Sequence, residues 1–172
     1  FFKLEGHSLE LICVNFLKSK KNADYNIKKI INLKKNIFNK SVIKDNYYPY
    51  VLKIIKLLKK SKIKIALVTS SHKAQLKNSS SSFFLDYFDF IVCGDEVKKN
   101  KPNPEPYLLA SNKLGVKPSD CLVVENAPIG IMAAKNARMK SLAITNTLNP
   151  YELSGADIII KNFSSMQYLN IF

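Results

Sequence analysis

Three polar side chains stand beside apolar segments of this sequence, in an arrangement that suits phosphoryl transfer. Thr69 and Glu125 each end an apolar run, and Lys101 opens the proline-rich stretch 101–107. A fixed ammonium group can stabilise phosphate charge, and a carboxylate is a preferred ligand of Mg²⁺. With the hydroxyl of Thr69, these groups indicate a site for a phosphorylated ligand.

The amides of Ser70 and Ser71 extend the interpretation of Thr69 as a phosphate-binding residue. They lead from a predicted strand into a predicted helix, and free N–H groups at a helix start attract anions. The alternative is that these hydroxyl side chains only cap the helix. His72 follows them and is interpreted as a residue of the helix surface.

Neighbouring residues favour a functional role for both Lys101 and Glu125. Pro102 restricts the backbone of Lys101 and can aim its ammonium group at one place, although a surface lysine is the simpler alternative. A carboxylate that ends an apolar strand must face a crevice, a cation or water. Asn126 adds a neutral oxygen beside Glu125, so the pair is a candidate Mg²⁺ site.

From residue 63 onward, apolar runs alternate with helical segments, which predicts an α/β fold with a parallel sheet. The expected strands are 63–69, 90–93, 121–125, 141–145 and 157–160, and the expected helices are 74–79, 104–114, 128–138 and 150–154. Ligands bind such sheets at the carboxyl ends of the strands. Thr69, Lys101 and Glu125 are therefore expected to face one crevice, whereas serines 79–82 predict a surface loop.

Residues 1–47 show helical periodicity and no clear strand. Apolar residues at helical spacing predict one helix near residues 9–17 and a second over 27–38, and a third follows at 51–60. We therefore expect a helical unit over 1–47 and an α/β core over 48–172.

The net charge of +14 raises the question of a nucleic-acid partner. Of 27 basic residues only Arg138 is arginine, the residue that recognises phosphate and bases in bidentate fashion. Lysine, asparagine and isoleucine share A/T-rich codons, so we expect no nucleic-acid partner. The alternative, a lysine-driven nucleic-acid binder, predicts steeply salt-dependent DNA affinity.

No apolar run approaches the roughly 20 residues of a membrane span, and no signal peptide is evident, so no membrane partner is expected.

Three cysteines, Cys13, Cys93 and Cys121, lie in apolar contexts without CxxC spacing. This pattern predicts buried thiols in a reducing cytoplasm, and neither a disulfide framework nor a zinc site.

Four motifs are similar to those of the haloacid dehalogenase superfamily, in its subgroup with a small helical cap. They are 68–70 (VTS), 94–97 (GDEV), 101–107 (KPNPEPY) and 124–131 (VENAPIGI). The subgroup includes phosphoglycolate phosphatases, sugar-phosphate phosphatases and β-phosphoglucomutase. The resemblance covers most of the chain and implies a Rossmann-like core with residues 1–47 as a partial helical cap.

The resemblance implies a Mg²⁺-dependent phosphatase that acts on a small phosphorylated metabolite through an aspartyl-phosphate, as a monomer. Thr69 corresponds to the hydroxyl that binds the transferring phosphoryl group. Lys101 corresponds to the lysine that neutralises charge on nucleophile and phosphate. Glu125 and Asn126 correspond to the acidic pair that holds Mg²⁺.

The sequence departs from the family at the nucleophile, because no Asp-x-Asp-Gly segment occurs. Only Asp24 and Asp45 precede Thr69, both in lysine-rich helical context. We expect the nucleophile and the central strand of the family to lie outside these residues. The chain as given would then be inactive, and the strands that end at Thr69 and Glu125 would each have an unpaired edge. The alternatives are a non-catalytic remnant and a phosphoglucomutase, although Leu9 stands where the mutases carry an arginine.

Overall fold

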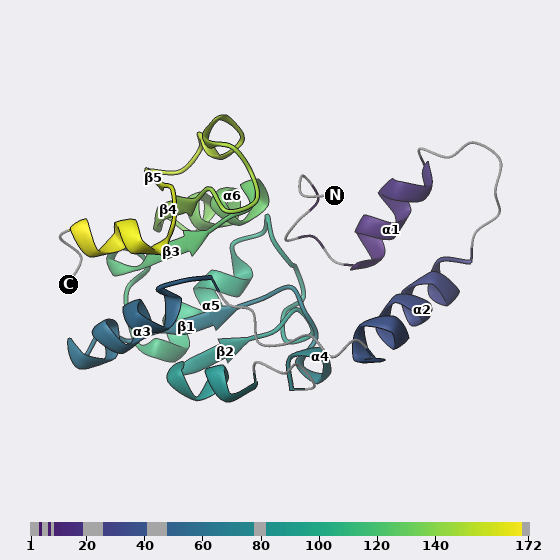
Figure 1. Cartoon of the computed structure of the whole chain (residues 1–172), viewed down its shortest axis with the longest axis horizontal. Coiled ribbons are helices and arrows are strands. Elements are labelled where there is room, and N and C mark those ends of the chain that lie inside the picture. Colours follow the sequence, from purple (N-terminus) through teal and green to yellow (C-terminus); the bar gives the residue numbers. More distant parts are fainter. Residues whose placement is uncertain are drawn as a thin grey trace.

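Five strands, all parallel to their neighbours, form two separate sheets in the computed structural model, which describes residues 4, 7, 9–18, 26–40, 48–77 and 82–169 (Figure 1). In one sheet β1 (Ala66–Val68) pairs with β2 (Phe90–Val92). In the other sheet the order is β3 (Leu122–Glu125), β4 (Lys140–Ile144) and β5 (Ile158–Ile160). The parallel α/β fold predicted from the sequence is confirmed, but its strands are divided between two sheets.

The break in the sheet falls between β1 and β3. Within the described residues, β1 pairs only with β2 and β3 pairs only with β4, so each has one edge without a strand partner. The Val124 side chain on β3 is 41% exposed. These are the two edges that the sequence predicted to be unpaired.

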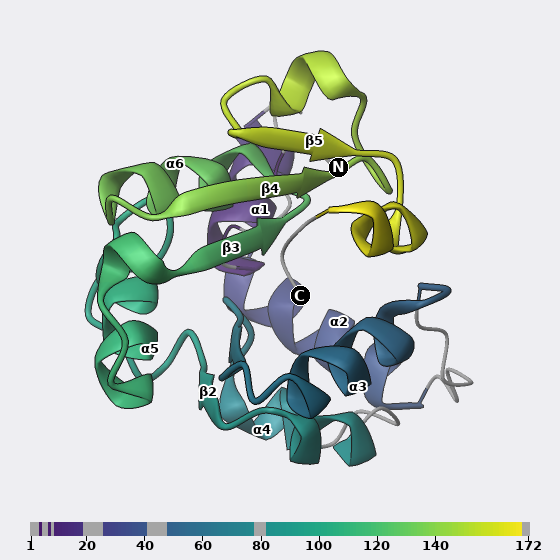
Figure 2. The ribbon, with the colours of Figure 1, turned by 90° about the vertical axis from the view of Figure 1, so that its left-hand side faces the viewer.

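Helices cover both sheets and bring the site segments to the break. Helix α5 (Glu105–Leu114) packs against β1 and β2, and α6 (Pro128–Asn136) packs against β3 and β4 (Figure 2). Gly115 ends α5 with φ 64°, a left-handed conformation that glycine adopts without strain. Pro128 occupies the first position of α6, where its missing N–H costs nothing.

The shorter elements differ from the sequence prediction. Helix α4 covers Lys73–Lys77, and the last two residues of the helix expected at 74–79 lie outside the described residues. The segment expected as a helix at 150–154 is the 3₁₀ segment η4 (Pro150–Leu153). The 3₁₀ segments η2 (Ser82–Tyr87), η3 (Pro118–Asp120) and η5 (Phe163–Tyr168) were not predicted. Such short segments carry too few residues for a periodic pattern. Of the four serines predicted to form a loop, 79–81 lie outside the described residues.

Helix α3 (Val51–Lys60) joins the core through a single apolar face. Ile54 and Ile55 are buried, and the helix packs against η2 and η5. The helices α1 (Leu9–Lys18) and α2 (Ile27–Lys40) instead pack on each other. Figure 1 shows this pair standing apart from both sheets.

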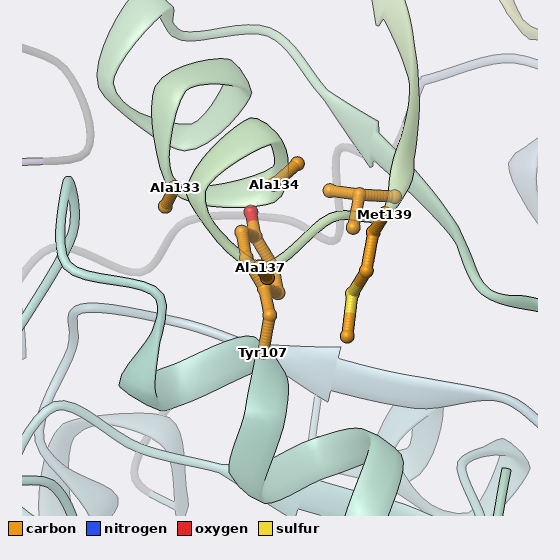
Figure 3. Packing of buried hydrophobic residues seen from close by; sticks show 6 residues of the cluster. Tyr107, Ala133, Ala134, Ala137 and Met139 are labelled. Carbon is orange, nitrogen blue, oxygen red and sulfur yellow. The ribbon is translucent and has the colours of Figure 1, made fainter. Parts of the chain in front are cut away.

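Two clusters of buried residues hold the core together. The first joins Tyr107 of α5 to α6 and to the strands that flank it, and Figure 3 shows the tyrosine ring approaching the alanines of α6. The second lies between α6, β4 and η4. The first cluster therefore links the helix of one sheet to the helix of the other.

The cysteines follow the sequence prediction only in part. Cys13 and Cys93 are buried, but Cys121 is partly exposed and its thiol donates to the Lys117 carbonyl at 3.3 Å. Cys121 directly precedes β3, at the rim of the sheet, so it lacks the cover that the apolar context predicted. All three are free thiols.

No helix among the described residues is long and apolar enough to cross a membrane.

Changing Asp157 to asparagine is expected to lower the free energy of unfolding by about 1 kcal/mol at pH 7, a small loss because the carboxylate is exposed. Its Oδ2 accepts from the Ser141 amide and hydroxyl, both at 2.7 Å, and these bonds lower the pKa of Asp157. The stabilisation is present above the ordinary pKa of 3.8 and is lost as pH falls through the lower folded-state value.

Urea unfolding of wild type and Asp157→Asn across pH 2–7 measures this effect, with Asp86→Asn as an exposed control. A stability gap that stays constant from pH 7 to pH 2 contradicts the assignment.

Candidate active site

A buried ion pair joins Lys101 to Glu125 at the end of β3. Lys101 Nζ lies 2.5 Å from Glu125 Oε1, and the two side chains are 7% and 9% exposed. The same ammonium group donates to the Val68 carbonyl at the end of β1, at 3.3 Å. Lys101 therefore lies at the break between the sheets, in contact with the carboxyl ends of both edge strands.

Hydrogen bonds between side chains and the main chain fix the loop before α5, which carries Lys101. The Glu105 carboxylate accepts from the amides of Lys98 and Lys99 at 2.8 and 2.9 Å. The Asn100 side chain donates to the Gly94 carbonyl at 3.1 Å, and the Lys101–Pro102 peptide is cis. A loop fixed by these three hydrogen bonds presents the Lys101 ammonium group at one place, as preorganised charge stabilisation requires.

Tyr107 is a third member of the site that sequence reasoning did not assign. Its hydroxyl donates to Glu125 Oε1 at 2.6 Å, and Lys101 Nζ lies 4.9 Å from its ring centroid. Burial, and then the charge of Glu125, raise the pKa of Tyr107 far above its usual range. The available signal was its place in the 101–107 motif, on the first turn of the helix that follows Lys101.

Thr69 follows β1 directly, and its hydroxyl is engaged locally. Thr69 Oγ1 accepts from the Ser71 amide at 3.1 Å, and the Thr69 amide donates to the Val92 carbonyl at 2.9 Å. Among the described residues, the Thr69 and Lys101 side chains share no hydrogen bond. They are connected through Val68, which precedes Thr69 and accepts from Lys101.

The loop of Ser70 and Ser71 is packed closely against Gly94. The Gly94 amide donates to the Ser71 carbonyl at 2.9 Å, and a Cβ at Gly94 would collide with the Ser70 backbone. Helix α4 begins at Lys73, so Ser70 and Ser71 precede it in the loop and are not its first residues. His72 is exposed, as expected.

Asn126 is tied to the loop after β4. Its Nδ2 donates to Thr147 Oγ1 at 3.2 Å, and its main-chain amide donates to Glu125 Oε2 at 3.1 Å. The Asn126 side chain is thereby anchored beside the Glu125 carboxylate.

The donor set of Glu125 and Asn126 fits part of a Mg²⁺ site. Within the part of the chain that the structure describes, Oε2 of Glu125 accepts only from the Asn126 amide, whereas Oε1 accepts from both Lys101 and Tyr107. Across the described ranges no three His, Cys, Asp or Glu side chains cluster as a metal site. Mg²⁺ keeps several waters and binds proteins through one or two carboxylates, so one further carboxylate would complete the set.

Changing Gly130 to alanine is expected to lower the free energy of unfolding by about 1–3 kcal/mol, because the added Cβ must displace the Glu125 carboxylate. A Cβ at Gly130 would collide with that carboxylate, which Lys101 and Tyr107 hold in place. Replacing a glycine inside a helix by alanine usually raises stability by roughly 0.5–1 kcal/mol. A loss of stability in Gly130→Ala would therefore report the collision.

Urea unfolding of wild type and Gly130→Ala measures this change. Gly155→Ala is the control, because its Cβ would meet Ile131 at an ordinary 3.5 Å. A Gly130→Ala protein as stable as wild type would show that the carboxylate can move away without cost.

Comparison with known proteins identifies the family. The sequence profile described as haloacid dehalogenase-like hydrolase matches residues 1–144. The chain belongs to this family. The haloacid dehalogenase resemblance drawn from the four sequence motifs is thereby confirmed.

Two curated relatives of this haloacid dehalogenase-like chain are phosphatases by name. The phosphorylated carbohydrates phosphatase of Thermotoga maritima is 33% identical over 140 residues, which cover 80% of this chain and 63% of the relative. The validoxylamine A 7'-phosphate phosphatase of Streptomyces hygroscopicus is 29% identical over 121 residues, which cover 70% of this chain and 57% of the relative. The chain thus spans less than two thirds of the length of either protein.

A solved structure of the same family shares the fold. The β-phosphoglucomutase of Clostridium difficile superposes with a TM-score of 0.76 and 25% identity, covering 96% of this chain and 76% of its own. The haloacid dehalogenase-like fold of this chain is therefore established by both sequence and structure.

Proposed function

We propose that the full-length protein is a Mg²⁺-dependent phosphatase that acts on a small phosphorylated metabolite through an aspartyl-phosphate. The observation that carries this proposal is the buried pair of Lys101 and Glu125 at the carboxyl ends of β1 and β3. Burying two charges is costly, and structural stability alone rarely requires it. At this edge of a parallel sheet, where ligands bind, a catalytic role explains the cost.

Each residue of the site has a role in this proposal. Lys101 stabilises negative charge on the transferring phosphoryl group and on the nucleophile. Thr69, with the amides of Ser70 and Ser71, binds the phosphoryl oxygens, and the Ser71 amide exchanges its bond to Thr69 Oγ1 for the ligand. Glu125 and Asn126 hold Mg²⁺, which when bound neutralises phosphate charge and orients the phosphoryl group.

The nucleophile is proposed to be an aspartate outside the 172 residues, on a strand that lies between β1 and β3. Both edges there lack a strand partner among the described residues, and Lys101 reaches from one edge to the other. An aspartate at the end of such a strand would stand beside Lys101 and complete the carboxylates that Mg²⁺ requires. In this proposal residues 1–172 alone do not turn over substrate.

The domain organisation, the substrate class and the oligomeric state are part of the same proposal. Residues 1–47, with the helix pair α1 and α2, form part of a cap over a core of residues 48–172. The substrate is a phosphorylated sugar or small acid, and the name of the Thermotoga maritima relative, a phosphorylated carbohydrates phosphatase, favours the sugar. The enzyme is proposed to be a cytoplasmic monomer.

A phosphoglucomutase is the second candidate, because the solved β-phosphoglucomutase shares the fold over nearly the whole chain. The two reactions differ in the fate of the phosphoryl group. A phosphatase releases it to water as phosphate, whereas a mutase returns it to a sugar.

The test is a panel of phosphorylated sugars and small phosphorylated acids, assayed with the full-length protein. We expect phosphate release that requires Mg²⁺ and stops with EDTA. Isomerisation of a sugar phosphate without phosphate release would favour the mutase. Mg²⁺-dependent hydrolysis of p-nitrophenyl phosphate by residues 1–172 alone would show that the nucleophile has been placed wrongly.

A further inference from the structure

The two oxygens of the Glu125 carboxylate have different surroundings. Oε1 accepts from Lys101 Nζ at 2.5 Å and from the Tyr107 hydroxyl at 2.6 Å. Among the described residues, Oε2 accepts only from the Asn126 main-chain amide, at 3.1 Å. Two short donors occupy the acceptor capacity of Oε1, so Oε2 is the oxygen left with capacity for a further ligand.

The Tyr107 hydroxyl is itself held firmly. The side chain is 5% exposed and its ring packs against Ala133, Ala134 and Ala137 (Figure 3). Tyr107 lies on α5, which packs on the β1–β2 sheet, whereas Glu125 ends β3 of the other sheet. The hydroxyl therefore bridges two sheets that no described strand pair connects.

The two donors on Oε1 are not equivalent. Lys101 carries three N–H donors, already divides them between Glu125 and the Val68 carbonyl, and can turn one to a phosphate. Tyr107 has a single O–H, directed at Glu125. It is the donor that can hold the carboxylate while Lys101 engages a phosphoryl group.

We propose that Tyr107 is a positioning residue that fixes the Glu125 carboxylate so that Oε2 faces the metal. This inference rests on the proposed function, because it assumes that Glu125 binds Mg²⁺. Residues that hydrogen-bond a metal-binding side chain and so orient it typically contribute 10- to 100-fold to metal affinity or activity.

The test is Tyr107→Phe in the full-length protein, which keeps the packed ring and removes only the hydroxyl. We expect Mg²⁺ affinity, titrated by calorimetry without substrate, to fall about tenfold or more. The Mg²⁺ activation constant should rise by the same factor, whereas kcat at saturating Mg²⁺ should stay within about threefold. Tyr151→Phe is the matched control, because the Tyr151 side chain is 87% exposed.

The rise in Tm that Mg²⁺ induces is measured beside the titration, so that a destabilised variant still reports its affinity. A lowered Tm with unchanged Mg²⁺ affinity would show that Tyr107 is only a packing residue and would overturn the inference. A wild-type protein that binds no Mg²⁺ would overturn the proposed function and this inference together. The two failures are therefore distinguishable.

Discussion

Replacing Lys101 by alanine in the full-length protein is expected to lower kcat about a hundredfold or more, the scale of losing one preorganised charge-stabilising group. Lys101 Nζ lies between Glu125 and the end of β1, and its loop is fixed by Glu105. Water that replaces the ammonium group must reorganise during the reaction, and it carries no charge. The loss should therefore appear in kcat more than in KM.

Lys99→Ala is the matched control, because Lys99 is an exposed lysine of the same loop. Steady-state kinetics at saturating Mg²⁺ separate the two variants. If Lys101→Ala retained wild-type kcat, Lys101 would be a structural partner of Glu125 and the proposed phosphoryl transfer would lose its main support.

Changing Glu125 to glutamine is expected to reduce kcat/KM about a hundredfold or more, again through the loss of one fixed charge at the site. Glutamine preserves the shape of the side chain and keeps an acceptor for Tyr107. It removes the negative charge that Mg²⁺ requires of its protein ligands. Mg²⁺ titration of the variant should show the corresponding loss of affinity.

The same substitution is expected to destabilise the fold by about 3 kcal/mol, because it leaves the Lys101 ammonium group buried without a counter-charge. The two side chains are 7% and 9% exposed, so water can replace little of the lost interaction. Urea unfolding measures the change, with Glu10→Gln on exposed α1 as the control. A variant as stable as wild type and still responsive to Mg²⁺ would contradict both assignments.

The strands were predictable because each is a short apolar run bounded by polar residues, a pattern carried by neighbouring positions. The 3₁₀ segments η2, η3 and η5 were not predictable in this way, since their few residues carry no period. Cys121 was predicted to be buried because its neighbours are apolar. Its exposure depends on which side of β3 receives cover, and only packing decides that.

The break between the two sheets was predicted in part from the sequence and explained in part only by the structure. The sequence indicated that the strands before Thr69 and Glu125 would each have an unpaired edge. The structure adds that Lys101 connects those edges, through the Val68 carbonyl on one side and Glu125 on the other. A loop residue reaches both strands only because α5 and α6 pack together through the Tyr107 cluster.

The sequence by itself determined the parallel α/β class, the placement of Thr69 and Glu125 at strand ends and that of Lys101 in a loop, because periodicity and strand boundaries are local properties. Only the tertiary structure decided how these groups are paired. Lys101 and Tyr107 lie 24 and 18 positions from Glu125, yet both donate to the same carboxylate oxygen. Contacts across such separations depend on how helices pack against sheets, and short-range patterns contain no information about that packing.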